Sequence, residues 1–108
     1  MRILILAAAV AALAAAPAAA ATRTVRVDDN YFVRSDKVPT VTVNKGTVVK
    51  WRWYGTRRHN VVVDRGPRIF RSKKKRTGTF ERTMRVRGTY RIICEVHDPY
   101  MRMRLVVE

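Results

Sequence analysis

Apolar and polar residues alternate along most of the chain after residue 21, in short runs separated by turn residues. The clearest run is Thr40-Val41-Thr42-Val43, in which every second residue is apolar. A period of two places one set of side chains on the buried face of a strand and the other set on its wet face. Runs of strand character are predicted over residues 24–28, 40–43, 47–53, 61–63, 77–84, 89–94 and 103–107.

Turn residues such as Asp29-Asn30, Asn44-Lys45-Gly46 and Arg87-Gly88 separate these runs. No run shows a sustained helical period. Short strands with turn signals about every eight to twelve residues are typical of an all-β sandwich or barrel. We therefore predict an all-β fold of seven or eight strands paired as antiparallel sheets.

Individual side chains can be assigned to the core from the same pattern. Val49, Trp51 and Trp53 share one face of their strand and are expected to be buried, with Lys50 and Arg52 on the wet face. We also expect three apolar groups to pack inward from elsewhere: the patch Tyr31-Phe32-Val33, Phe80 and Met84.

The first 21 residues have the layout of a secretory signal peptide. Met1-Arg2 supplies a positive start, an apolar run extends from Ile3 to Ala16, and Pro17 precedes small alanines up to Ala21. An uncleaved anchor helix is the alternative, but the run falls short of the roughly 20 apolar residues of a bilayer span. We predict a cleaved signal over residues 1–21, a mature domain over residues 22–108, and a periplasmic or secreted protein without a transmembrane anchor.

The charge balance favours anionic partners. The chain has 23 Lys and Arg against 8 Asp and Glu, a net charge of +15, and the predicted signal contributes only Arg2. The basic stretch Arg71 to Arg76 is interpreted as a solvated loop. Nucleic-acid binding would require aromatic residues placed for stacking beside the cations, and Phe70 is the only candidate. An acidic protein or an anionic surface polymer or lipid fits better.

One short stretch concentrates the candidate chemistry. It contains the only cysteine, Cys94, with His97 three residues later and Met101 four beyond that. The only other histidine, His59, precedes the apolar run Val61-Val62-Val63. Thiolate, imidazole and thioether groups are the ligands that select copper, and two histidines, a cysteine and a weak axial methionine form a blue-copper electron-transfer site.

Three other roles for Cys94 fit the sequence less well. A buried, inert thiol is common for free cysteine, but it leaves His97 and Met101 unexplained. Zinc prefers four tetrahedral N, S or O ligands, for which methionine is a poor choice. A cysteine-protease dyad needs a histidine base oriented by a third group, and nothing in the sequence supplies a substrate cleft.

These motifs resemble the cupredoxins, and within them the plastocyanin-like small blue copper proteins. The resemblance covers nearly all of the chain after residue 21. It implies a Greek-key β-sandwich with one type 1 copper. The motifs that carry it are Gly46 with Val48-Val49-Lys50-Trp51, His59-Asn60-Val61, Gly78-Thr79-Phe80, Gly88 to His97, Met101 and Leu105-Val106-Val107.

The resemblance also implies roles for individual residues. The copper ligands fall on His59, Cys94, His97 and Met101, and Met103 is a competing candidate for the axial position that the alignment disfavours. Asn60 falls on the family's asparagine, which tethers the two ligand loops and donates a backbone hydrogen bond to the thiolate. The chain departs from the family at Arg58, where members often have proline, and at Met103, where a glycine often stands.

The function that follows is transfer of single electrons by a monomeric carrier, not an enzyme. His97 is expected to be the more exposed ligand and the electron port, and the redox partner is expected to be acidic. Copper storage, delivery or resistance without a dedicated redox partner is the alternative function. A basic binding module with a structural copper is a third.

Overall fold

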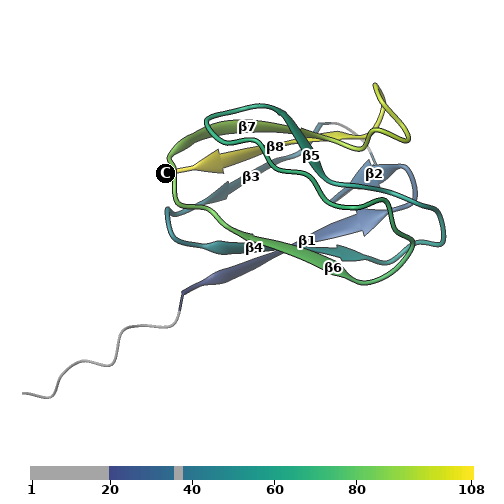
Figure 1. Cartoon of the computed structure of the whole chain (residues 1–108), viewed down its shortest axis with the longest axis horizontal. Coiled ribbons are helices and arrows are strands. Elements are labelled where there is room, and N and C mark those ends of the chain that lie inside the picture. Colours follow the sequence, from purple (N-terminus) through teal and green to yellow (C-terminus); the bar gives the residue numbers. More distant parts are fainter. Residues whose placement is uncertain (1–19, 36–37) are drawn as a thin grey trace, which may run out of the picture.

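The computed structural model describes residues 20–35 and 38–108, and Figure 1 traces the chain through them. This part of the chain forms eight strands, without a helix that could span a membrane. The all-β prediction is therefore confirmed, while the predicted signal peptide lies almost entirely outside the described residues. The strands are β1 (Thr22–Asp28), β2 (Tyr31–Phe32), β3 (Thr40–Val43), β4 (Val48–Trp53), β5 (Val62–Arg65), β6 (Thr79–Thr83), β7 (Gly88–Ile93) and β8 (Arg102–Val107).

The strands form two four-stranded sheets, one in the order β2-β1-β4-β6 and the other in the order β3-β8-β7-β5. The two sheets lie one above the other in Figure 1. The prediction of antiparallel pairing is only partly right, because β1 pairs with β4 and β3 pairs with β8 in parallel. The chain moves to the other sheet between β2 and β4, so β4 returns beside β1 in the same direction.

The parallel pairing brings several strand ends together at one end of the sandwich. Val27, near the end of β1, pairs with Trp53, the last residue of β4. In the other sheet Ile93, the last residue of β7, pairs with Arg102, the first residue of β8. The loops that leave β1, β4 and β7 therefore meet on the right-hand side of Figure 1. These loops contain the predicted site residues.

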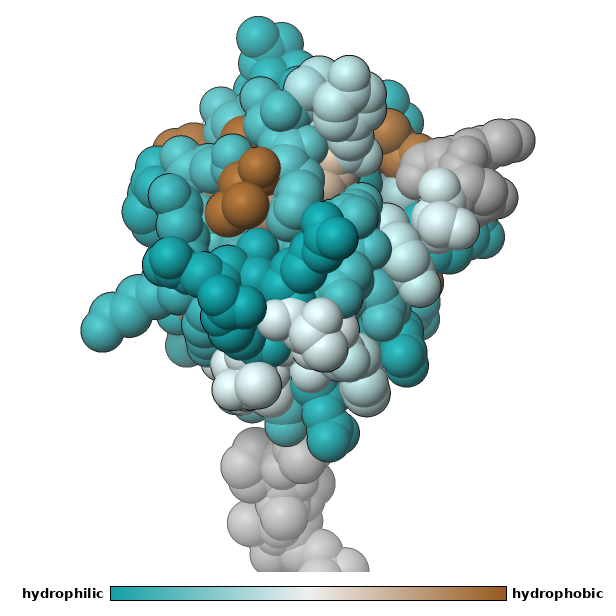
Figure 2. Space-filling model, turned by 90° about the vertical axis from the view of Figure 1, so that its right-hand side faces the viewer, coloured by the Kyte–Doolittle hydropathy of each residue, from teal (hydrophilic) through white to brown (hydrophobic). Residues whose placement is uncertain are grey.

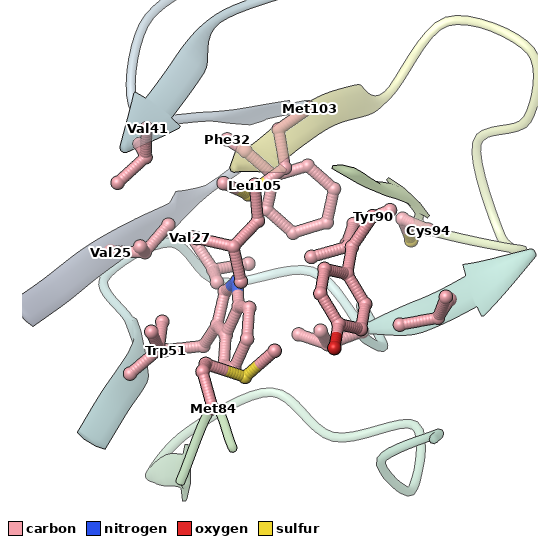
Figure 3. Packing of buried hydrophobic residues seen from close by; sticks show 14 of the residues in the cluster. Val25, Val27, Phe32, Val41, Trp51, Met84, Tyr90, Cys94, Met103 and Leu105 are labelled. Atoms are coloured by element: carbon pink, nitrogen blue, oxygen red, sulfur yellow. The ribbon is translucent and has the colours of Figure 1, made fainter. Parts of the chain in front are cut away.

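The core between the sheets follows the alternation in the sequence (Figure 3). Val49, Trp51 and Trp53 on β4 are all buried, whereas Arg52 is exposed. Phe32 and Met84 are also buried, and Phe80 packs against the core at its margin. The apolar patch at residues 31–33 provides β2, which pairs with β1 as a hairpin. The inward positions predicted from the sequence are thus confirmed except at Tyr31, which is only partly buried and lies outside the core cluster.

Candidate metal centre

Three predicted site residues meet at the end of the sandwich where the loops converge. His59 Nδ1 lies 3.2 Å from His97 Nδ1, and Cys94 Sγ lies 3.8 Å and 3.7 Å from these two nitrogens. His59 and Cys94 are fully buried, and His97 is half-buried. Among the described residues, this is the one group of three or more His, Cys, Asp or Glu side chains close enough to bind a metal.

A tight loop after β7 presents Cys94 and His97. Cys94 is the first residue after the strand, and its backbone N–H donates to the carbonyl of Met101 at 3.0 Å. The N–H of His97 donates to the carbonyl of Cys94, and the N–H of Tyr100 donates to the carbonyl of His97. These bonds fold the loop back on itself, so that two side chains three residues apart point to one place.

The basic segment at residues 71–76 forms one wall of the site. His59 and Lys75 exchange two backbone hydrogen bonds of 3.0 Å, as in an antiparallel bridge. The N–H of Ser72 donates to the carbonyl of Val61, and the Ser72 hydroxyl accepts from the Val61 N–H. The interpretation of this stretch as a solvated loop was incomplete, because its backbone is paired to the segment that contains His59. Most of its cationic side chains do face water, as predicted.

Asp29, in the turn between β1 and β2, contacts His59 from the side opposite the cluster. Its carboxylate accepts a hydrogen bond from His59 Nε2 at 3.0 Å and others from Thr56 and Arg57. These hydrogen bonds hold the pKa of Asp29 well below its ordinary value. The bond from the Arg57 backbone N–H has the largest effect, followed by those from His59 and Thr56. The carboxylate is therefore ionised at neutral pH.

Asn60 joins the two loops that carry the cluster. Its side-chain oxygen accepts from the backbone N–H of Glu95 at 2.8 Å, and its amide nitrogen donates to the Glu95 carboxylate at 2.8 Å. Arg71 donates to the same carboxylate at 2.6 Å. These contacts with Asn60 and then Arg71 lower the pKa of Glu95. Asn60 thus links the loop of His59 to the residue next to Cys94.

His97 is the member of the cluster nearest to solvent. A hollow of about 470 Å³ lies beside it, lined by Asn30, Arg57, Val96, His97, Asp98 and Tyr100. Burial lowers the pKa of His97, and the nearby His59 and Arg57 lower it further. Figure 2 looks onto this end of the molecule and shows a mostly hydrophilic face with small, separate apolar patches.

Both candidate axial methionines are fully buried, but their backbones are placed differently. Met101 lies just before β8, and its backbone N–H donates to the carbonyl of His97 at 3.3 Å while its carbonyl accepts from Cys94. Met103 lies within β8 and pairs with Ile92. Met101 therefore belongs to the same turn as Cys94 and His97, and Met103 belongs to the sheet.

The distances within the cluster are close to those between the ligand atoms of a metal site. Metal bonds of about 2.0–2.1 Å to nitrogen and about 2.3 Å to sulfur would place three such donors about 3.3–3.8 Å apart. The two nitrogen–sulfur separations of 3.7 and 3.8 Å fall within this range, and the nitrogen–nitrogen separation of 3.2 Å lies just below it. A thiolate with two imidazoles suits copper. The residues present therefore fit one copper ion.

Sequence reasoning missed three residues around the cluster: Asp29, Arg71 and Glu95. Asp29-Asn30 was recognised as a turn, but no local pattern connects that turn to a histidine 30 positions later. Glu95 lies beside Cys94 and could have been suspected from that position alone. Arg71 carries no signal, because it is one of many cations in the chain.

Comparison with known proteins supports the fold. No protein-family model and no curated protein sequence matches the chain. Among solved structures, two amicyanin mutants, one reduced and one in the Cu(I) form, match with TM-scores of 0.69 and 0.68 at 23% and 24% identity. Each match covers 85% of this chain and 87% of amicyanin.

A Cu-containing nitrite reductase from Thermus scotoductus SA-01 also matches, with a TM-score of 0.64 and 26% identity over 79% of this chain. The chain spans only 22% of the length of that enzyme, so the likeness concerns one part of the reductase. By its two-sheet architecture and these neighbours the chain is a cupredoxin in fold, with a His-Cys-His cluster that supports one copper site.

Proposed function

We propose that this protein carries single electrons outside the cytoplasm on one type 1 copper, with His59, Cys94, His97 and Met101 as its ligands. The observation that carries the proposal is the cluster of two imidazole nitrogens and one thiol sulfur, all within 4.8 Å of one another. A copper ion bound by such a set exchanges one electron between Cu(II) and Cu(I). No substrate chemistry is assigned to the site.

The hydrogen bonds around the cluster suit an electron carrier. His59 is held by its backbone bonds to Lys75 and by its ring contact with Asp29. Cys94 is held by its backbone bond to Met101, and the adjacent Glu95 is tied to Asn60. Side chains fixed by surrounding contacts keep the same positions in both oxidation states. Small rearrangement on electron transfer is what a carrier requires.

We propose that electrons enter and leave the copper site through His97. We also propose that the redox partner docks with an acidic surface. Arg57 lines the hollow beside His97, and its backbone contacts Asp29 while its side chain is exposed. Arg58 is exposed as well, whereas Arg102 is paired with Asp98 at 2.9 Å. Cations at this face would attract an acidic partner and raise the association rate at low salt. We propose that the carrier acts as a monomer.

The proposal includes export of the mature domain. Residues 1–21 have the layout of a signal peptide, with residues 22–108 as the part that remains. Although the nitrite reductase neighbour is an enzyme by name, we assign this chain the role of carrier.

The first test is optical and paramagnetic spectroscopy of purified mature protein loaded with Cu(II). We expect an intense visible band from thiolate-to-copper charge transfer and a paramagnetic signal from one copper per chain. Titration should end at one equivalent, because the described residues hold a single cluster of this kind. A colourless complex after copper loading would contradict the proposal.

A second test separates the two methionines. Met101→Leu should change the visible spectrum and raise the reduction potential, because leucine removes the weak thioether contact while keeping a similar volume. Met103→Leu is the matched control, since Met103 is equally buried but lies within β8. We expect its spectrum and potential to resemble those of the unmodified protein. The opposite pattern would assign the axial position to Met103.

A further inference from the structure

Asp29 brings a carboxylate to the ring of His59 from the β1–β2 turn, 30 positions earlier in the sequence. Its Oδ1 accepts from the Arg57 N–H at 2.9 Å and lies 3.0 Å from His59 Nε2. Its Oδ2 accepts from the N–H and hydroxyl of Thr56 at 3.1 and 3.2 Å. One side chain therefore connects the β1–β2 turn to the loop that presents His59.

The contact determines which nitrogen of His59 faces the cluster. An ionised carboxylate only accepts hydrogen bonds, so Nε2 must be the nitrogen that carries the proton. In a neutral imidazole the other nitrogen, Nδ1, then has a free lone pair. That nitrogen lies 3.2 Å from His97 Nδ1 and 3.8 Å from Cys94 Sγ. The ring is thus held in the one tautomer that can offer Nδ1 to a metal.

Gly55 makes this close approach possible. A Cβ atom added at Gly55 would lie 2.2 Å from Asp29 Oδ1 and 2.9 Å from the Asp29 backbone nitrogen. Contacts this short would push the carboxylate or the whole turn away. The loop therefore has no side chain at the position where the Asp29 carboxylate must fit. Gly55→Ala offers a way to displace Asp29 without changing its chemistry.

We propose that Asp29 is a positioning residue for the metal centre: it fixes the tautomer and orientation of His59, and its negative charge favours Cu(II) over Cu(I). The effect of the charge on the two oxidation states rests on the proposed copper function. Hydrogen bonds from metal-bound histidines to carboxylates raise the basicity of the ligand, and loss of such partners typically lowers metal affinity about 10–100-fold. The carboxylate opposes the surrounding cations, which favour Cu(I).

The tautomer can be read in metal-free protein by long-range ¹H–¹⁵N correlation of the two histidine rings. We expect His59 to carry its proton on Nε2 in the unmodified protein. Asp29→Asn should keep this tautomer, because the amide oxygen can still accept from Nε2. Asp29→Ala should give a mixture of tautomers, and Gly55→Ala should resemble it. If Asp29→Ala or, where that variant does not fold, Gly55→Ala keeps a pure Nε2–H ring, Asp29 does not position His59.

The charge effect is measured on the copper-loaded protein. Asp29→Asn should lower the preference for Cu(II) over Cu(I) about tenfold, which raises the potential by about 59 mV for a one-electron couple. Asp64→Asn is the matched control, because it removes the same charge from a carboxylate that binds Arg91 on β7. It should change the potential much less. Equal changes of the reduction potential in the two variants, or an unchanged potential in Asp29→Asn, would overturn the proposed effect of the Asp29 charge.

The ring measurement and the potential measurement together distinguish a failure of the Asp29 proposal from a failure of the proposed copper function. If unmodified protein forms no thiolate-to-copper band, the proposed function fails, and the metal-free ring measurement still decides whether Asp29 positions His59. If the band forms but neither the tautomer nor the potential responds to Asp29, the copper function stands and Asp29 serves only to close the loop through Thr56 and Arg57.

Discussion

Replacing Cys94 by serine is expected to abolish the visible charge-transfer band of the copper-loaded protein while the β-sandwich stays folded. The band requires the thiolate sulfur, and a serine hydroxyl cannot supply it. The fold should tolerate the change because serine is close in size and the backbone bond from residue 94 to Met101 does not involve the side chain. The two ring nitrogens lie 3.8 and 3.7 Å from the sulfur, too far for a hydrogen bond to a serine hydroxyl. A buried hydroxyl without a partner costs about 1–3 kcal/mol, which is the loss of stability we expect.

Visible absorbance after copper loading and circular dichroism on heating provide the two readouts for Cys94→Ser. Met84→Leu is a suitable control, because it removes a buried sulfur at the opposite end of the sandwich, where the Met84 backbone bonds Gly46 and Thr47. This control should keep the full band. A Cys94→Ser protein that stays intensely coloured would mean that another group binds the copper.

The largest effect on stability is expected for Trp51→Ala. Trp51 is fully buried on β4 between β1 and β6, and its ring lies 5.8 and 5.9 Å from those of Phe70 and Phe80. Truncating a buried aromatic residue to alanine costs about 3–5 kcal/mol. Since small domains have a free energy of unfolding of about 5–15 kcal/mol, much of the stability of the metal-free protein should be lost.

Urea unfolding followed by circular dichroism measures this loss. Arg52→Ala is the matched control, one residue along the same strand with its side chain in solvent, and it should change the free energy of unfolding by about 0.5 kcal/mol or less. Copper should restore part of the stability of Trp51→Ala, because an ion that binds only the folded state shifts the equilibrium toward it. Equal stability of the two variants would show that the sheets close over the gap.

Much of the sandwich was predictable because strand periodicity is local. In Thr40-Val41-Thr42-Val43, the alternation in the sequence is the alternation of burial in β3. The same holds for Val49, Trp51 and Trp53 in β4. The parallel pairs β1–β4 and β3–β8 were not predictable, because they depend on the route of the chain between the sheets. Each strand has the same period of two whichever direction its neighbour takes.

The ligand types were visible in the sequence, but the surroundings of the cluster were not. Cys94, His97 and Met101 lie within eight residues, so a tight loop is enough to bring their backbones together. The structure places His59 and Asn60 beside this loop, as the resemblance implied. The metal roles of His59, Cys94, His97 and Met101 remain predictions, although the positions of the first three now satisfy the distances that such roles require.

The strand pattern, the donor chemistry and the excess of positive charge can be read from the chain alone, since each depends on residue types and on spacings of a few positions. The groups that surround the donors are known only from the folded structure. It brought His59 to His97 across 38 positions, placed the Asp29 carboxylate behind His59, and joined Arg71 and Glu95 beside Asn60. These contacts arise from the way two sheets pack and their loops meet, and no local pattern encodes that arrangement.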